Sequence, residues 1–282
     1  MPENYNDCLA VVKEFIPVFE NSEIGKIGQN LKYDISILKW YHVEVKGPLF
    51  DTMLAHYLLQ PDMRHNMDIL AETYLNYNPV PIEDLIGKKG KKQLSVRSVD
   101  LDVLKDYACE DADITLQLKK VFEPELKVNK AEDLFYKIEV PLVPVLANME
   151  AEGVKLDIPT LRDYSGQLEK EITELEKEIQ EQAGVEFNIA SPKQLGEVLF
   201  EKMVITDKPK LTKTKQYSTG EDVLVKLINK HPIIQNILDY RSLTKLKSTY
   251  VDTLPDMVNP RTGRIHTSYN QAVAATGRLS SN

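Results

Sequence analysis

The chain has 282 residues, a formal net charge of -8 and 42% hydrophobic residues, which together favour a folded protein over a disordered one. The acidic balance excludes a protein coated with positive charge, although a local basic face would suffice to bind nucleic acid. Cys8 and Cys109 fit no metal spacing, and the five histidines are scattered, which argues against zinc. With no signal peptide at the first residues and no apolar run that could span a bilayer, we expect a reduced, cytoplasmic environment and no membrane partner.

In the first half of the chain, apolar residues recur mainly at helical spacing. We predict helices at about 8–20, 30–40, 51–60, 67–77 and 100–122, a short strand at 25–29, and a loop at 85–100. In the helix at 100–122, the row Leu104, Ala108, Ala112 and Leu116 is expected to be buried. Tyr107 and Asp111 are expected beside that row, where a side chain can be held firmly and still reach solvent.

Beyond residue 130 the pattern becomes nearly all helical. We predict helices at 131–151, 158–183, 192–201, 219–230 and 232–256, with a basic irregular loop at 202–218. Residues 264–274 alternate like a strand. The apolar stripe of the helix at 158–183 covers fewer than four heptads, so it predicts one arm of a helical hairpin rather than a coiled coil with a partner.

Tyr107 and Asp111 lie four residues apart on a predicted helix and therefore project from the same face. Asp34, at the start of another helix, could converge on the same point. Carboxylates gathered in this way hold two divalent cations about 4 Å apart for phosphodiester hydrolysis, and a tyrosine hydroxyl can orient the attacking water. From the spacing alone, an ordinary acidic helix surface is the simpler explanation.

Several long motifs, in order, resemble those of bacterial DNA polymerase I, the family A DNA polymerases. Three motifs resemble the proofreading exonuclease of this family: Gly28-Gln-Asn-Leu-Lys-Tyr-Asp34, Asp51-Thr-Met-Leu54 and Tyr107-Ala-Cys-Glu-Asp111. Four later segments resemble the start of its polymerase region: 139–146, 240–250, Arg264-Ile-His-Thr-Ser-Tyr269 and Thr276-Gly-Arg-Leu-Ser-Ser281. The resemblance implies a truncated ribonuclease H-like α/β exonuclease domain at 1–130, a mainly α-helical thumb at 131–260 and the first palm strands at 261–282. The whole is expected to be helix-rich.

The same resemblance assigns Asp34 and Asp111 to the binding of two different metal ions and Tyr107 to positioning the attacking water. The family's first acidic motif, Asp-x-Glu, does not occur in residues 1–33, so two of its four carboxylates are absent. In the family, the palm aspartates that form the polymerase active site come after the motif that matches 276–281. The parent is thus expected to perform Mg²⁺-dependent DNA-directed DNA synthesis with 3′–5′ proofreading in replication and repair, while this segment is expected to be inactive and not to hold Mg²⁺ at catalytic spacing.

By the same resemblance, basic residues of the thumb would contact the phosphates of duplex primer-template DNA, which is sequence-independent and salt-sensitive binding. The residues are Lys208, Lys210, Lys213, Lys215, Arg241 and Lys245, while Arg278 would reach the primer terminus. The alternatives are a solvated loop and an exposed helix face. The loop at 87–92 lacks the spacing of a P-loop and is either a plain surface loop or a contact for a single-stranded 3′ end.

A bacterial, nucleoid-associated location is expected. The absence of early strands leaves apolar faces and strand edges uncovered, which predicts self-association, rearrangement or poor order before residue 130, while the thumb is expected to fold as a unit. Two other functions compete. A 3′–5′ exoribonuclease of the four-acid family would share the acidic and tyrosine motifs but would not continue into the motifs at 264–269 and 276–281. A non-catalytic helical adaptor would need no pairing of Tyr107 with Asp111.

Overall fold

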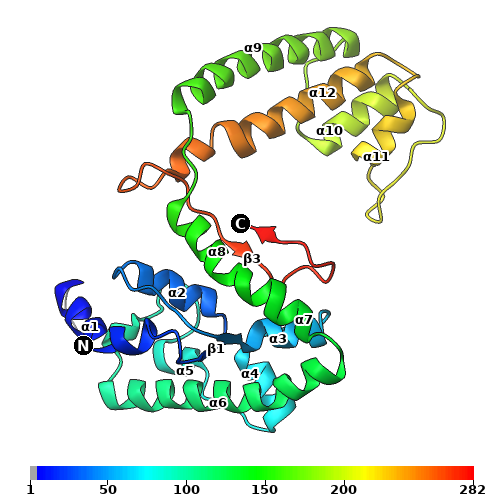
Figure 1. Cartoon of the computed structure of the whole chain (residues 1–282). Helices are drawn as coiled ribbons and strands as arrows, with labels where there is room; N and C mark the ends of the chain where they lie inside the picture. Colours follow the sequence, from blue (N-terminus) through cyan, green and yellow to red (C-terminus); the bar gives the residue numbers. More distant parts are fainter. Residues whose placement is uncertain (1–4) are drawn as a thin grey trace. The chain divides into compact units, whose positions relative to one another are not determined.

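The computed structural model describes residues 5–282 and contains two compact units (Figure 1). The first unit is built from two separate stretches of chain, up to Gly153 and from His266 onward. The second unit, Val154–Ile265, is inserted between them. Helices make up most of both units, which confirms the prediction of a helix-rich protein.

The first unit combines short strands with helices of very different length. Its elements are α1 (Tyr5–Phe19), β1 (Lys26–Gly28), α2 (Leu31–Lys39), β2 (Leu49–Asp51), α3 (Thr52–Leu59), α4 (Met67–Leu70) with the π-turn η1 (Ala71–Leu75), α5 (Ile82–Ile86), η2 (Val96–Ser98), α6 (Leu101–Val128), α7 (Glu132–Leu134) with η3 (Phe135–Glu139), α8 (Val140–Glu152), β3 (Tyr269–Asn270) and β4 (Ser280–Ser281). β1 and β2 pair in parallel, with Ile27 opposite Phe50, and β3 and β4 pair antiparallel. Pro17 lies inside α1, which nevertheless continues to Phe19.

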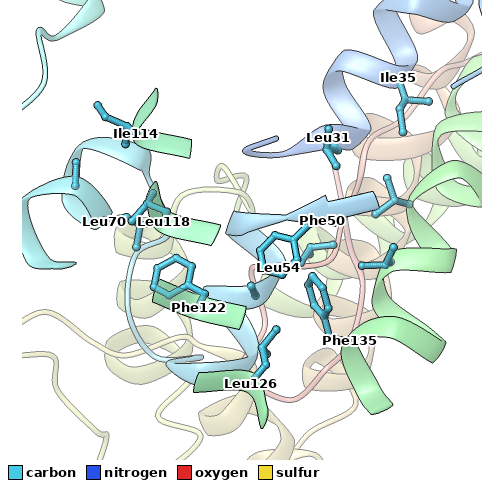
Figure 2. Packing of buried hydrophobic residues seen from close by; sticks show 14 of the residues in the cluster. Leu31, Ile35, Phe50, Leu54, Leu70, Ile114, Leu118, Phe122, Leu126 and Phe135 are labelled. Atoms are coloured by element: carbon cyan, nitrogen blue, oxygen red, sulfur yellow. The ribbon is translucent and has the colours of Figure 1, made fainter. Parts of the chain in front are cut away.

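The core of the first unit forms where α3, α6 and η3 meet β2. Figure 2 shows Phe50 and Phe135 side by side, with ring centroids 5.0 Å apart, and Leu54 nearby. From α6 come Ile114, Leu118, Phe122 and Leu126, at most 2% exposed. Because each fully buried side chain of this size stabilises the fold by about 1.5–3 kcal/mol, this cluster provides a rigid base for the helices around it.

The buried face of α6 differs from the predicted row. Ala108, Ala112 and Leu116 are exposed, whereas the buried stripe begins at Ile114 and recurs every four residues. Two residues correspond to about 200° around a helix, so the buried stripe lies nearly opposite the predicted row. Tyr107 and Asp111 therefore lie in line with the buried stripe, on its half-buried N-terminal extension, rather than beside it.

Asp51 ends β2 and caps two helices. Its carboxylate accepts the backbone N–H groups of Met53 and Leu54 at the start of α3, at 2.9 and 3.2 Å. It also accepts those of Asn30 and Leu31 at the start of α2, at 3.2 and 2.7 Å. Burial raises the pKa of Asp51 to about 6, and the four N–H donors act in the opposite direction. One side chain thus fixes where α2 and α3 begin.

A second buried polar group joins α3 to the chain around it. His56 is fully buried, and its Nδ1 lies 2.8 Å from Nδ1 of His65 while its Nε2 lies 3.0 Å from the Tyr74 hydroxyl. Burial, and secondarily the charge of His65, lowers the pKa of His56 to about 4. The ring is therefore neutral at neutral pH and acts as a hydrogen-bonding link between α3 and η1.

The C-terminal stretch 266–282 is held to the first unit by polar contacts. Lys32 on α2 pairs with Glu150 on α8 and donates to the Tyr269 carbonyl at 2.6 Å, while the Tyr269 N–H donates to Glu150 at 2.7 Å. Gln271 is buried and donates to the Glu139 carboxylate at 2.7 Å. These contacts join residues more than a hundred positions apart in the sequence.

The second unit is mainly a helical hairpin with a smaller helical cap (Figure 1). Its elements are α9 (Ile158–Ala183), α10 (Pro192–Glu197) with η4 (Val198–Lys202), α11 (Glu221–Leu224) with η5 (Val225–Leu227), α12 (Ile233–Leu246) with η6 (Lys247–Val251), and η7 (Leu254–Met257). α9 packs against α12, as the hairpin prediction required, and Ile179, Leu195 and Ile234 lie in the shared core. The segment 210–218 turns back on itself, with a β-bridge between Leu211 and Tyr217.

No helix within residues 5–282 is both long and apolar enough to cross a membrane.

Candidate functional site

Asp34 and Asp111 line the same groove in the first unit. The groove has a volume of about 920 Å³ and lies along β1, α2 and α6. Its wall is mainly apolar, with Ile27, Leu31 and Leu116 among the lining side chains. The two carboxylates come from different helices, α2 and α6, so the fold brings together residues that are 77 positions apart by their numbers.

Asp34 lies in the first turn of α2, whose start is set by Asp51. Asn30, the residue just before α2, has a left-handed backbone with φ of 64°, which asparagine tolerates better than most residues. Desolvation by the surrounding atoms raises the pKa of Asp34, although its side chain remains accessible to solvent from the groove. The N-terminal end of α2 favours a negative charge at this position.

Tyr107 and Asp111 interact directly on α6. Burial, followed by the negative charge of Asp111, raises the pKa of Tyr107 to about 12, so its hydroxyl keeps its proton at neutral pH. Burial raises the pKa of Asp111, and a hydrogen bond from Tyr107 acts in the opposite direction. Two further carboxylates, Glu110 and Asp68, also raise the pKa of Asp111.

Asp68 was not among the predicted site residues. It lies in the short helix α4, and its charge reaches both Tyr107 and Asp111. The available sequence signal was its place in the first turn of a predicted helix, which is too common a position to single it out. Glu110 has a structural task, because it accepts hydrogen bonds from the Tyr77 hydroxyl at 2.5 Å and the Val80 N–H at 3.0 Å.

The described residues do not fit a two-metal centre by themselves. Within residues 5–282, no group of three or more His, Cys, Asp or Glu side chains is placed to hold a metal ion. Hard divalent cations need several oxygen ligands, and Asp34 and Asp111 supply one carboxylate each. The groove therefore offers negative charge and a phenolic hydrogen-bond donor, without a complete ligand set for magnesium.

Some of the predicted DNA-binding residues are exposed, and others form ion pairs or hydrogen bonds within the second unit. Lys208, Lys213 and Lys215 are exposed, as are Lys245 on α12 and Arg278 between β3 and β4. Lys210 pairs with Asp222 at 3.1 Å, both side chains being well exposed.

Arg241 is bonded inside the second unit. Its guanidinium donates to the Thr219 carbonyl at 2.5 Å and lies 3.4 Å from the Thr219 hydroxyl, and burial lowers its pKa. The neighbouring cation Lys247 is also engaged, pairing with Glu169 at 3.2 Å and Asp252 at 2.8 Å. Much of the positive charge on α12 and η6 is therefore used to hold the unit together.

Two family models match successive parts of the chain. The model described as 3′–5′ exonuclease matches residues 3–127, and the model described as DNA polymerase family A matches residues 158–282. DNA polymerase I of Chloroflexus aurantiacus is 44% identical over 98% of this chain and 30% of the relative, and that of Pseudomonas aeruginosa is 43% identical over 96% and 30%.

A solved structure is also similar along the whole chain. The POL domain of Pol1 from M. smegmatis, in complex with DNA primer-template and dNTP, superposes with a TM-score of 0.75 and 31% identity over 99% of this chain and 44% of that one.

An exonuclease region followed by a polymerase region defines a class of DNA polymerases that carry a proofreading domain. The chain belongs to the family A DNA polymerases and corresponds to a segment of bacterial DNA polymerase I. It spans about 30% of the length of the curated relatives it matches. The resemblance inferred from the sequence motifs is confirmed.

Proposed function

We propose that this chain supplies part of a 3′–5′ exonuclease site and a surface that binds duplex DNA, and that alone it neither hydrolyses nor synthesises DNA. The observation that carries this proposal is that Asp34 and Asp111 line one groove, with Tyr107 near Asp111 on the same helix, in the region that matches the exonuclease model. The donor set is incomplete among the described residues. The whole protein would synthesise DNA on a template and proofread it with Mg²⁺, in the bacterial cytoplasm.

Within the groove, the proposed roles follow from charge and protonation. The Tyr107 hydroxyl, with its pKa of about 12, would donate a hydrogen bond to a water molecule or a phosphate oxygen. Asp34 and Asp111 would supply ligands for separate cations once the remaining carboxylates are provided. Asp51 would act as a positioning residue, since it fixes the start of the helix that carries Asp34.

Duplex binding is assigned to the exposed lysines. Lys213 and Lys215 lie near the tip of the turn at 210–218, and Lys208 precedes it. Lysine contacts with phosphate do not depend on the DNA sequence, and they weaken as the salt concentration rises. We assign Arg241 to holding the Thr219 loop rather than to DNA, because its donors point at Thr219.

The duplex surface can be tested by fluorescence anisotropy with labelled primer-template DNA at about 50 and 200 mM salt. We expect the slope of log affinity against log salt to become shallower by about 2 in the Lys213→Ala/Lys215→Ala variant, since about 0.9 is lost for each phosphate contact. Lys105→Ala, which removes a lysine paired with Asp102 in the first unit, is the matched control. Binding that does not respond to salt would contradict the proposal.

Catalysis is tested separately, by incubating the chain with a labelled single strand and Mg²⁺. We expect no hydrolysis beyond that of an Asp111→Ala preparation. Nuclease activity that disappears with Asp111→Ala would show that the chain completes the site in some other way and would refute the inactivity proposal.

The two competing functions receive no support from a specific observation. The match to the polymerase family over 158–282 disfavours both an exoribonuclease and a simple helical adaptor. Self-association stays a prediction, and light scattering at two protein concentrations would test it.

A further inference from the structure

The segment 60–66, which joins α3 to α4, is fastened to the rest of the first unit through one residue. Residues 60–64 are exposed. The His65 ring has its Nδ1 2.8 Å from Nδ1 of His56 on α3, and it packs edge-on against Tyr57 with ring centroids 5.7 Å apart. The His65 carbonyl accepts a hydrogen bond from the Gln29 side chain at 2.6 Å. Among residues 5–282, the side-chain hydrogen bonds and ring contacts of this segment all involve His65.

The contact between the two rings has room for one proton only. Each nitrogen of a neutral imidazole either donates or accepts, whereas a protonated ring donates from both nitrogens. Since Nδ1 of His56 faces Nδ1 of His65 at 2.8 Å, one nitrogen carries the hydrogen and the other accepts it. The pair can bind one extra proton, because one ring still accepts. When both rings are protonated, two N–H groups and two positive charges face each other, and the hydrogen bond is lost.

The surroundings of His56 oppose a positive charge. Its ring is fully buried, with the apolar ring of Phe122 on α6 at a centroid distance of 5.5 Å and the Tyr74 hydroxyl of η1 at 3.0 Å. Burial, followed by the charge of His65, lowers the pKa of His56 to about 4. Glu125 on α6 acts on the pKa of Tyr74, and within residues 5–282 no carboxylate contributes to the lowered pKa of His56.

The other elements packed against α3 bring no compensating charge to the ring. β2 and η3 contribute Phe50 and Phe135 to the core beside α3. The Asp51 carboxylate, at the end of β2, is engaged with backbone N–H groups at the starts of α2 and α3. Burial also lowers the pKa of His65, so both rings are neutral in the closed arrangement at neutral pH.

We propose that His56 and His65 form an acid-sensitive latch, called here the histidine latch, which holds the segment 60–66 on α3 at neutral pH and releases it when both rings are protonated. Release lets water reach the rings, and an imidazole in water has a pKa of about 6.5. The released state therefore binds protons more readily than the closed state, so acid favours release. The proposal goes beyond the proposed function because it requires neither DNA nor a metal.

The histidine latch borders the groove that holds Asp34 and Asp111. Gln29, whose side chain donates to the His65 carbonyl, lines this groove. Met67 begins α4 two residues after His65 and lines the groove as well. Release of the segment would therefore loosen one wall of the groove while the helices that carry the two carboxylates stay in place.

Amide hydrogen exchange of the full chain at pH 7 and pH 5 tests the latch. The reporters are the Met63 amide, which bonds to the Gln60 carbonyl within the segment, and the Leu70 amide, which bonds to the Asn66 carbonyl. Given a pKa of about 4 for the closed His56 ring and about 6.5 after release, His56 alone can increase the released population by up to about 20-fold between these pH values. We expect the protection factors of both reporters to fall accordingly.

Matched variants separate the latch from general acid effects. His65→Ala removes the latch, so both reporters should already exchange faster at pH 7 and should change little on going to pH 5. His42→Gln replaces an exposed histidine and should leave the pH response unchanged. The buried α6 residues Leu118 and Phe122 report on global unfolding, and their amides should stay protected at pH 5. Circular dichroism establishes that each variant is folded.

Three outcomes would overturn the proposal. The first is equal protection of the two reporters at pH 7 and pH 5 in the unchanged chain. The second is loss of protection in α6 together with the segment, which would assign the acid response to global unfolding. The third is a His65→Ala variant that keeps the full pH response of the unchanged chain.

Discussion

Removing the Asp51 carboxylate is expected to loosen two helices at once. Asp51→Ala deletes the acceptor for four backbone N–H groups, two at the start of α2 and two at the start of α3. A single helix cap contributes about 1 kcal/mol, and a buried donor left without a partner costs a further 1–3 kcal/mol. Since Asp51 is only 1% exposed, water cannot replace it, and we expect a loss of about 3–4 kcal/mol.

The loss is measured by urea unfolding and by amide hydrogen exchange of α2 and α3. Asp51→Asn keeps one acceptor oxygen and should lose about half as much. Asp100→Ala, which removes the exposed cap of α6 alone, should cost about 1 kcal/mol. Faster exchange in α3 with no change in α2 would refute the idea that one carboxylate holds both helices, as would a total loss no larger than that of Asp100→Ala.

Three further predictions concern the first unit. Gly47→Ala should destabilise the first unit by about 1–3 kcal/mol in thermal unfolding, because φ is 89° and the new Cβ would lie 2.7 Å from the Ile24 carbonyl oxygen. The control is Gly166→Ala on α9 of the second unit, where the new Cβ meets open space and the change should be neutral or stabilising. Lys32→Met should cost about 3 kcal/mol by leaving the Glu150 carboxylate without a cation, and adding Glu150→Gln should recover most of this loss. Between pH 6 and 4, the raised pKa of Asp51 should increase the free energy of unfolding as pH falls, because the folded state binds the proton first. The lowered pKa of His56 should decrease the free energy of unfolding over the same range, because the unfolded state binds that proton first. Asp51→Asn removes the first effect and should therefore make the loss of stability in acid steeper in urea titrations.

Local patterns predicted the helices well, because their signals lie within a few residues of each other. The hairpin of α9 and α12 follows from apolar spacing. α2 begins next to Asn30, as predicted, although the Asn30 side chain makes no cap hydrogen bond there. The shared face of Tyr107 and Asp111 also follows from helical geometry alone.

The face of α6 that is buried could not be read from the same pattern. Both the row with Ala112 and the row with Ile114 are apolar, and only the position of β2 and Phe135 decides between them. The tasks of Asp51 and Arg241 were hidden for the same reason. Each depends on backbone groups that are about 20 residues away in sequence, and nothing in the composition around either residue indicates those partners.

The arrangement of the first unit has a consequence for how the chain is made. Tyr269 and Gln271 bind side chains and backbone more than a hundred residues earlier, so the first unit is incomplete until these residues have been translated. The inserted second unit uses one continuous stretch and can fold as soon as it leaves the ribosome. During synthesis, α2 and α8 would thus be present before Tyr269 is available to bind Lys32 and Glu150. We expect chaperones to bind that early stretch until β3 and β4 have formed.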